Sequence, residues 1–277
     1  MSDRSEFAAY LRFRRASLSP TDVGLPAGER RRTPGLRREE ISRLANISTT
    51  YYTFLEQGRP VRPSRAVIDA LATALRLSEA ERTQFRVLAE AEPWVGTNEG
   101  AHDVTEGVHQ LLDHLDPWPA FVRDARWDIL GSNAAAASLY RGFAARPTGE
   151  LNLLWWVFCD PSAREVYVDW EEQALGMLAK FRLSSARHAG DPAFTEVLDA
   201  VLDSSEHARS WWPRHQLGIT ASTVKRFRHP ALGELSLRNV HLAVSEDDDQ
   251  TIVAFAPMQG APTDLRRLLD GSIEPGR

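Results

Sequence analysis

One stretch of the chain, NISTTYYTFLEQG at residues 46–58, carries small polar side chains at the spacing of one helix face. At about 100° per residue, Tyr51, Tyr52 and Leu55 fall on one side of a helix and most of the polar residues on the other. Hydroxyl and amide groups can hydrogen-bond to base edges or phosphates in a DNA groove, and a threonine methyl group can contact the methyl group of thymine. The candidate DNA contacts in this stretch are Ser48, Thr49, Thr50, Thr53, Phe54 and Gln57.

Phe54 is the unusual member of this set, because a side chain that reads bases would more naturally be Arg, Gln or Asn. It falls at the edge of the polar face, one turn from Tyr51. Its ring could extend the core or press on a thymine methyl group, and both arrangements bury it. The sequence leaves these two interpretations open.

The residues before this stretch predict a helix that would hold it against a core. A helix-turn-helix motif needs apolar residues at fixed offsets, a small residue where its helices touch, and a turn residue that tolerates positive φ. Ile41 and Ala45 meet the first two needs, and Asn46 meets the third. A helical hairpin inside an ordinary α-helical domain is the alternative, but the combination favours DNA binding. The candidate phosphate contacts around the motif are Arg38, Arg59 and Arg62.

The charge of the chain is divided unevenly between its two parts. Residues 1–92 hold 16 Arg and 12 acidic residues, a balance of +4, and the whole chain of 277 residues has a net charge of −5, which leaves −9 for residues 93–277. A basic first part joined to an acidic second part fits a nucleic-acid contact confined to the first. Ordinary variation between solvated surfaces is the alternative.

Length and composition fit a cytoplasmic protein of two domains. The start of the chain lacks the apolar segment of a signal peptide, and no run approaches the roughly 18 apolar residues of a membrane-spanning helix. Cys159 is the single cysteine, which excludes an intramolecular disulfide. We therefore expect no membrane segment.

The order of the predicted elements indicates an α+β protein. Residues 1–92 predict an all-α DNA-binding domain of five helices, and 93–104 a linker. Residues 105–277 predict a helix, two short strands, a mainly helical middle and three more strands. This order is typical of a PAS-like fold, a five-stranded antiparallel sheet with helices on one side. Asn133 follows the second strand and is expected to cap the next helix.

Aromatic and aliphatic side chains are dense in the second part, and as a set they could line an apolar cavity. For each of them singly, ordinary core packing is the alternative. The candidate ligand contacts are Phe121, Trp127, Leu130, Tyr140, Leu153, Trp155, Phe158, Trp170 and Phe227.

Basic residues near such a cavity could hold a carboxylate head group. For those in RFRH at 226–229, the solvent face of an edge strand is the alternative. The candidates are Arg187, His188, Arg226, Arg228 and His229.

Motifs of catalysis and metal binding are missing from the chain. There is no G-x-S-x-G, H-E-x-x-H, C-x-x-C or G-x-x-x-x-G-K-[ST], and the eight histidines form no metal spacing. We expect no enzyme, no metal and no cofactor other than a bound apolar ligand.

Two resemblances add to this reading. EEISRLANISTTYYTFLEQG resembles the XRE-type helix-turn-helix of phage repressors, in which an Arg of the first helix pairs with the Glu of the LExG ending. The matching residues are Arg15 and Glu56, a structural pair. That family usually has Gly where Asn46 stands and Arg where Phe54 stands, so the phosphate or guanine contact that the resemblance implies is absent at Phe54.

The wider resemblance is to the MmyB-like regulators and covers almost the whole chain. It is carried by GLPAGERRRTPGLRREEISRLANISTTYYTFLEQGRPVRPS, RWDILGSNAAAASLY, NLLWWVFCDPSARE, DWEEQALGMLAKFRLSSARHAGDP and VKRFRHPALGELSL. It implies an XRE-type domain coupled to a PAS-like domain that binds a small apolar ligand. In that family a fatty acid has been associated with the pocket.

The expected function is a ligand-responsive, sequence-specific transcription regulator that binds a double-stranded DNA operator as a homodimer. The alternative is a DNA-binding regulator whose second domain only dimerises, without a ligand.

Overall fold

The computed structural model describes residues 5–26, 35–90, 104–140, 151–214, 223–245, 247–258 and 265. Contacts divide the chain into two compact units. The first comprises Met1–Val95, Arg182–Pro192 and Ser210–Ile219, and the second comprises Gly96–Phe181, Ala193–Arg209 and Thr220–Arg277. The expected domain boundary, with a linker at 93–104, falls almost wholly on residues outside the described ranges and stays a prediction. The two later segments of the first unit were not anticipated from the sequence.

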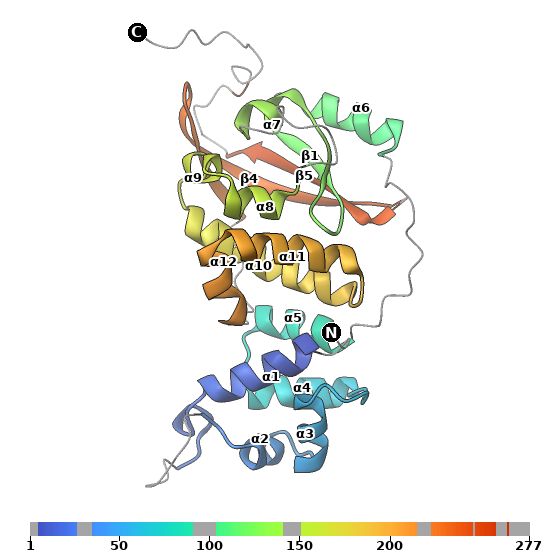
Figure 1. The fold of residues 1–277 in the computed structure, drawn as a ribbon, viewed down its shortest axis with the longest axis vertical. Helices are drawn as coiled ribbons and strands as arrows, with labels where there is room; N and C mark the ends of the chain where they lie inside the picture. Colours follow the sequence, from blue (N-terminus) through green and yellow to red (C-terminus); the bar gives the residue numbers. More distant parts are fainter. Residues whose placement is uncertain are drawn as a thin grey trace. The chain divides into compact units, whose positions relative to one another are not determined.

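Five α-helices form the main part of the first unit, as the periodicity predicts (Figure 1). Ser48 and Ser64 accept hydrogen bonds from Tyr51 N and Val67 N and so begin two of these helices. The helices are α1 (Ser5–Ser17), α2 (Arg38–Leu44), α3 (Thr49–Glu56), α4 (Arg65–Ala74) and α5 (Glu79–Glu90), with a short 3₁₀ helix η1 (Thr21–Val23) after α1.

The core of this unit is apolar and is drawn from all five helices. Its buried side chains include Leu11, Ile41, Tyr52, Leu71 and Phe85. Burial of such side chains contributes about 1.5–3 kcal/mol each and holds α3 in place against α1 and α2.

Gly35 lies shortly before α2 in the chain. Its φ is +89°, and a Cβ at this position would lie 2.6 Å from the backbone oxygen of Ala16. The backbone at Gly35 therefore lies so close to α1 that only glycine fits there without strain.

The second unit is built on a five-stranded antiparallel sheet with the strand order β2-β1-β5-β4-β3 (Figure 1). This confirms the α+β, PAS-like architecture predicted from the order of elements. The strands are β1 (Ala120–Arg123), β2 (Ile129–Ser132), β3 (Val224–His229), β4 (Gly233–Val244) and β5 (Asp247–Pro257).

Helices cover both faces of this sheet, whereas the sequence predicted helices on one side. Helix α6 (Glu106–Leu115) packs its Val108 and Leu112 on the face that carries Val122 and Ile252. Figure 1 shows α8 (Leu153–Cys159) and α10 (Trp170–Arg187) on the opposite side of the sheet. The other helices after β2 are α7 (Ala134–Leu139), α9 (Ser162–Val166), α11 (Pro192–Ser204) and α12 (Glu206–Trp211), followed by the 3₁₀ helix η2 (Trp212–Arg214).

Asn133 fixes the junction between β2 and α7. Its side-chain oxygen accepts from the backbone N–H groups of Ala120 and Ala136, both at 3.0 Å, and its amide donates to the carbonyls of Leu112 and Trp118. The buried side chain thus caps α7 and also ties β1 to the end of α6.

None of the helices among the described residues is both long and apolar enough to cross a bilayer.

Candidate functional site

The outer face of α3 presents the polar residues that the sequence singled out. Tyr52, Leu55 and Glu56 are buried on the inner side, whereas Thr50 and Gln57 are exposed. Thr49, Thr53 and Phe54 are partly exposed, and Ser48 caps the helix. The Thr53 hydroxyl donates to the Thr49 carbonyl at 2.8 Å, so it remains free to accept a hydrogen bond from another molecule.

Asn46 forms the turn between α2 and α3. Its φ is 53°, in the left-handed region that Asn tolerates, and its N–H donates to the carbonyl of Arg43. The N–H of Ile47 donates to Ser42 O at 2.9 Å and closes the turn. The side chain of Asn46 takes the place of the glycine usual in this motif without breaking the turn.

A buried carboxylate joins the end of α3 to two other helices. Glu56 accepts hydrogen bonds from Arg15 Nε at 2.5 Å and from Arg38 Nε at 2.6 Å. Burial raises the pKa of Glu56, but the hydrogen bonds from Arg15 and Arg38 outweigh it and leave the pKa below its ordinary value. Arg38, expected as a phosphate contact, is thus anchored to Glu56, while 43% of its side chain remains exposed.

Phe54 and Arg59 form a stacked pair at the C-terminal end of α3. The guanidinium carbon of Arg59 lies 4.4 Å from the centre of the Phe54 ring. The backbone N–H of Arg59 donates to the Phe54 carbonyl at 3.0 Å, and that of Gly58 donates to Leu55 O at 3.1 Å. With Gly58 at φ 66°, these bonds form a Schellman motif that ends the helix. Arg62 follows and is exposed.

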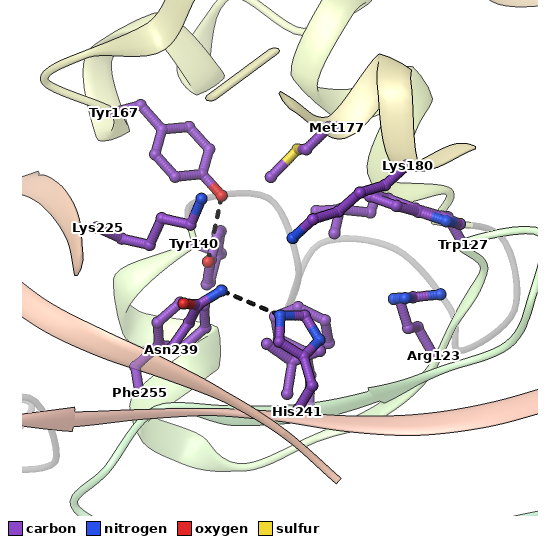
Figure 2. Close-up of a pocket in the computed structure, with 13 residues that line it drawn as sticks. Arg123, Trp127, Tyr140, Tyr167, Met177, Lys180, Lys225, Asn239, His241 and Phe255 are labelled. Carbon is purple, nitrogen blue, oxygen red and sulfur yellow. Dashed lines mark hydrogen bonds between the residues drawn. The ribbon is translucent and has the colours of Figure 1, made fainter. Parts of the chain in front are cut away.

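A cavity lies between the sheet and the helices in the second unit (Figure 2). Its volume is about 30 Å³, which is room for one or two waters. One wall is aromatic and aliphatic, and the other side carries cationic and polar groups. The lining residues are Phe121, Arg123, Trp127, Tyr140, Leu153, Tyr167, Met177, Lys180, Lys225, Asn239, His241, Val253 and Phe255.

Tyr140 is the centre of the aromatic wall. Its ring packs edge to face against Phe121 and Phe227, each with 5.7 Å between ring centres. Its hydroxyl lies 3.3 Å from that of Tyr167 (Figure 2). The wall therefore offers an apolar surface with a paired hydroxyl group on it.

Four basic side chains form the polar side of the cavity. Figure 2 shows Lys180 and Lys225 reaching into the same space, with Arg123 and His241 beside them on the sheet. Burial and the charge of Lys180 lower the pKa of Lys225 to about 8 despite the nearby carboxylate of Glu172. Burial lowers the pKa of Arg123 to about 10, and burial together with the charge of Arg123 lowers that of Lys180. With these values, Arg123 and Lys225 stay predominantly cationic at neutral pH.

His241 lies at the same side and is neutral at pH 7. Although part of its surface is exposed, burial and the positive charges of Lys180, Arg123 and Lys225 lower its pKa to about 4. Its Nε2 is 3.0 Å from Asn239 Nδ2, which donates to it (Figure 2).

Two of the three cations of the cavity have neutral partners within the part of the chain that the structure describes. Lys225 donates to the side-chain oxygen of Gln173, and Arg123 donates to the backbone carbonyl of Asp124 at 2.8 Å. The guanidinium of Arg123 also lies 4.5 Å from the centre of the Trp127 ring. No ion pair joins Arg123, Lys180 or Lys225 to a carboxylate among the described residues. Positive charge is therefore gathered here without a direct counter-charge.

The β1–β2 turn holds Trp127 in a strained conformation. Its φ is 75°, which a bulky side chain rarely adopts. The turn is held by Asp124, whose carboxylate accepts from the N–H of Asp128 at 2.9 Å and from Arg126 Nε at 3.0 Å. This network directs the indole ring of Trp127 to the cavity, where Arg123 packs on it.

Four of the nine predicted ligand contacts line the cavity, and five lie elsewhere. Leu130 packs with α6 on the opposite face of the sheet, and Phe227 lies in the aromatic cluster behind Tyr140. Phe158 and Trp170 pack on each other, with 6.2 Å between their ring centres. Trp155 also lies outside the cavity. The four predicted residues that line the cavity are Phe121, Trp127, Tyr140 and Leu153.

The predicted carboxylate-binding residues also lie away from the cavity. Arg226 pairs with Asp169 and Glu234 on the exposed side of β3, and Arg228 lies on the same side. Arg187 and His188 belong to the first unit, and His229, though buried, does not line the cavity.

The basic residues that line the cavity were not predicted from the sequence. These are Arg123, Lys180, Lys225 and His241. Alternation along β3 contained a signal, because Phe227 must face inwards and Lys225, two residues earlier, shares its face.

Comparison with known protein families matches residues 104–269 to the MmyB-like transcription regulator ligand binding domain and residues 6–85 to a helix-turn-helix domain. The first match alone spans more than half of the chain.

The chain belongs to the MmyB-like transcription regulators. Comparison with curated proteins gave no match. In this MmyB-like regulator, α3 lies within the helix-turn-helix match and every residue of the cavity lies within the ligand-binding match. The chain thus joins a DNA-binding domain to a ligand-binding domain, the composition of a ligand-responsive transcription regulator.

Proposed function

We propose that the second unit binds an apolar ligand with one negatively charged head group, such as a fatty acid, and that binding changes the affinity of α3 for its DNA operator. The observation that carries this proposal is the group of Arg123, Lys180 and Lys225, which face one cavity beside an aromatic wall without ion-paired carboxylates among the described residues. Gathering buried positive charge costs free energy, and an anionic group in the cavity offsets that cost.

The charge balance of the cavity favours a ligand with a single negative charge. Arg123 and Lys225 are cationic at neutral pH, and Asp124, the carboxylate whose charge acts on Arg123, is already paired with Arg126. The carboxylate of Glu172 opposes part of the lowering of the Lys225 pKa and so offsets part of this charge, which leaves about one positive charge to be neutralised. A carboxylate held by Lys and Arg donors forms charge-assisted hydrogen bonds, which are stronger than neutral ones.

The size of the cavity sets a condition on binding. Ligand sites commonly have about 300–1,000 Å³, and a space of about 30 Å³ is far smaller. A ligand tail therefore enters only by displacing side chains. Met177 and Lys180 of α10 are long and unbranched, so they can adopt other rotamers at low cost.

The DNA-binding part of the proposal concerns the exposed face of α3. We propose that the exposed side chains of Thr50 and Gln57 contact base edges and that those of Arg59 and Arg62 contact phosphates. One recognition helix reads only a half-site, so we propose that two copies of the chain bind a pseudo-palindromic operator as a homodimer.

A second candidate function is a regulator whose second unit only dimerises. The small volume of the cavity favours it, because a space nearly filled by side chains is an ordinary core. A purely dimerising unit gives no role to the cations Arg123, Lys180 and Lys225.

Binding of dodecanoate separates the two candidates. The intact protein is titrated with dodecanoate, and with dodecanol as an uncharged control of equal length, while the fluorescence of Trp127 and the other indoles is recorded. We expect saturable binding of the acid and much weaker binding of the alcohol.

Two variants sharpen this test. Lys225→Gln should weaken binding of dodecanoate about tenfold or more, since it removes a charge-assisted bond of roughly 1.5–3 kcal/mol. Arg228→Gln, with the same charge change on the solvent side of the same strand, should bind like the unchanged protein. Equal binding of acid and alcohol would contradict the proposed role of the cations. No binding of either, with no ligand recovered by solvent extraction, would support the dimerising function.

A further inference from the structure

Arg59 is held at the end of α3 by two separate interactions with Phe54. The Schellman hydrogen bond fixes its backbone to the Phe54 carbonyl, and the ring of Phe54 lies 4.4 Å below its guanidinium group. The Schellman motif is often accompanied by an apolar contact between these same two positions, and here a cation–π contact occupies that place.

A guanidinium group on an aromatic ring keeps its hydrogen-bond donors available. The ring attracts the positive charge through its π face and takes up none of the five N–H groups. Arg38 is held differently, because its Nε donates to Glu56. Arg59 forms no ion pair with a carboxylate among the described residues, so it is oriented and still able to bind an anion.

The position of Arg59 favours a phosphate over a base. It lies two residues beyond the C-cap Gln57, past the exposed face on which Thr50 and Gln57 point outwards. Groups that flank a recognition helix commonly contact the DNA backbone, while those on its outer face contact base edges.

We propose that Phe54 is a positioning residue, whose ring holds the Arg59 guanidinium in place to bind a DNA phosphate. This inference rests on the proposed DNA binding by α3. It gives the aromatic residue a role in affinity that acts through Arg59 and not through contact with a base.

The test is a double-mutant cycle on the intact protein. Affinity is measured over a range of salt concentrations for two duplexes of equal length, one recovered from a random-sequence pool by the unchanged protein and one of mixed sequence. The variants are Phe54→Leu, Phe54→Tyr, Arg59→Gln and the double variant Phe54→Leu/Arg59→Gln. Thermal unfolding of each variant shows that the helix remains folded.

Phe54→Leu should weaken binding to both duplexes about twofold to fivefold, the range of an exposed cation–π contact, and should leave the salt dependence nearly unchanged. Phe54→Tyr, which keeps the aromatic face, should bind like the unchanged protein. Arg59→Gln should weaken binding to both duplexes and lower the slope of log K against log salt by about 0.9. In the double variant, loss of Phe54 should add nothing to loss of Arg59.

Three outcomes overturn the inference. A loss for Phe54→Leu that is confined to the recovered duplex and persists in the Arg59→Gln background would show a base contact. Equal affinity of Phe54→Leu and the unchanged protein would show that the ring only packs. If the unchanged protein binds neither duplex, the proposed DNA binding fails as well, and the first two outcomes leave that function standing.

Discussion

The buried carboxylate of Glu56 should be the most sensitive single group in the DNA-binding unit. Its side chain has no exposed surface and holds Arg15, whose side chain is 19% exposed, and Arg38, which is 43% exposed. Glu56→Gln keeps the volume and removes the charge. Two guanidinium groups then lie against a neutral amide, and Arg15 is the more deeply buried of them.

The expected cost is about 2–3 kcal/mol of the free energy of unfolding. Breaking a buried pair from one side commonly costs about 3–5 kcal/mol, because the remaining charge stays buried without its partner. The lower figure applies here because Arg15 keeps its hydrogen bond to Leu36 O at 2.8 Å, and Arg38 can turn to solvent. The ion pair of Glu56 with the partly exposed Arg38 contributes only about 0–1 kcal/mol of this cost.

Urea unfolding followed by circular dichroism measures this cost, and hydrogen exchange of peptides from α1 to α3 locates it. Glu39→Gln is the matched control, since this exposed residue of α2 undergoes the same change of charge. It should cost no more than a few tenths of a kcal/mol.

The pH dependence gives a second measurement of the same effect. The folded pKa of Glu56 lies below its ordinary value of 4.5, so its contribution is fully present above pH 4.5 and is lost as the pH falls through the folded pKa. The difference between the unchanged protein and Glu56→Gln should therefore shrink in acid. Equal stability of the two proteins at pH 7, or a difference that persists unchanged at low pH, would refute this account of the ion pair.

Three further predictions concern binding and the second unit. Dodecanoate affinity should fall as the pH rises above about 8, where Lys225 loses its proton. This fall should be smaller in Lys225→Gln, and an affinity that does not change with pH would contradict the proposed role of Lys225 in binding the carboxylate. Asn133→Ala should lower the free energy of unfolding by at least about 3 kcal/mol in urea, because several buried backbone groups lose their partner; a loss below about 1 kcal/mol would contradict it. Thr50→Ala should weaken binding to the selected duplex by about 1 kcal/mol and leave mixed-sequence DNA unaffected, and an equal loss on both would exclude a base contact.

The elements were predictable where local signals agreed. Caps such as Ser48 and Ser64 lie next to apolar residues at helical spacing, and the two signals together place the helices of the first unit. In the second unit, β4 alternates from Leu235 to Leu237 before an acidic turn. These signals act within one turn or one strand, so no knowledge of the partner elements is needed.

The packing of helices on both faces of the sheet was harder to predict from the sequence. A helix such as α6 shows which of its own sides is buried but not which face of a distant sheet it covers. A weak signal exists in β1, whose Ala120, Phe121 and Val122 are apolar without alternation, the pattern of a strand buried on both sides.

The cavity was only half predictable because its two walls follow different rules. Aromatic residues are expected inside, so Phe121 and Tyr140 could be named from their type alone. Buried cations oppose that rule. Lys180 and Arg123 lie on a helix and a strand far apart in the chain, and only the tertiary fold brings them together.

The small volume of the cavity, about 30 Å³, also affects how a search for the ligand of the second unit should be designed. Docking by shape to this conformation would discard molecules with an alkyl tail, since none fits in this volume unless lining side chains such as Met177 and Lys180 move. The charge pattern changes less than the shape when side chains of α10 move, because Arg123 and Lys225 lie on strands of the sheet. Screening should therefore begin from libraries of small organic acids of graded chain length, and read out heat of binding or unfolding temperature instead of geometric fit.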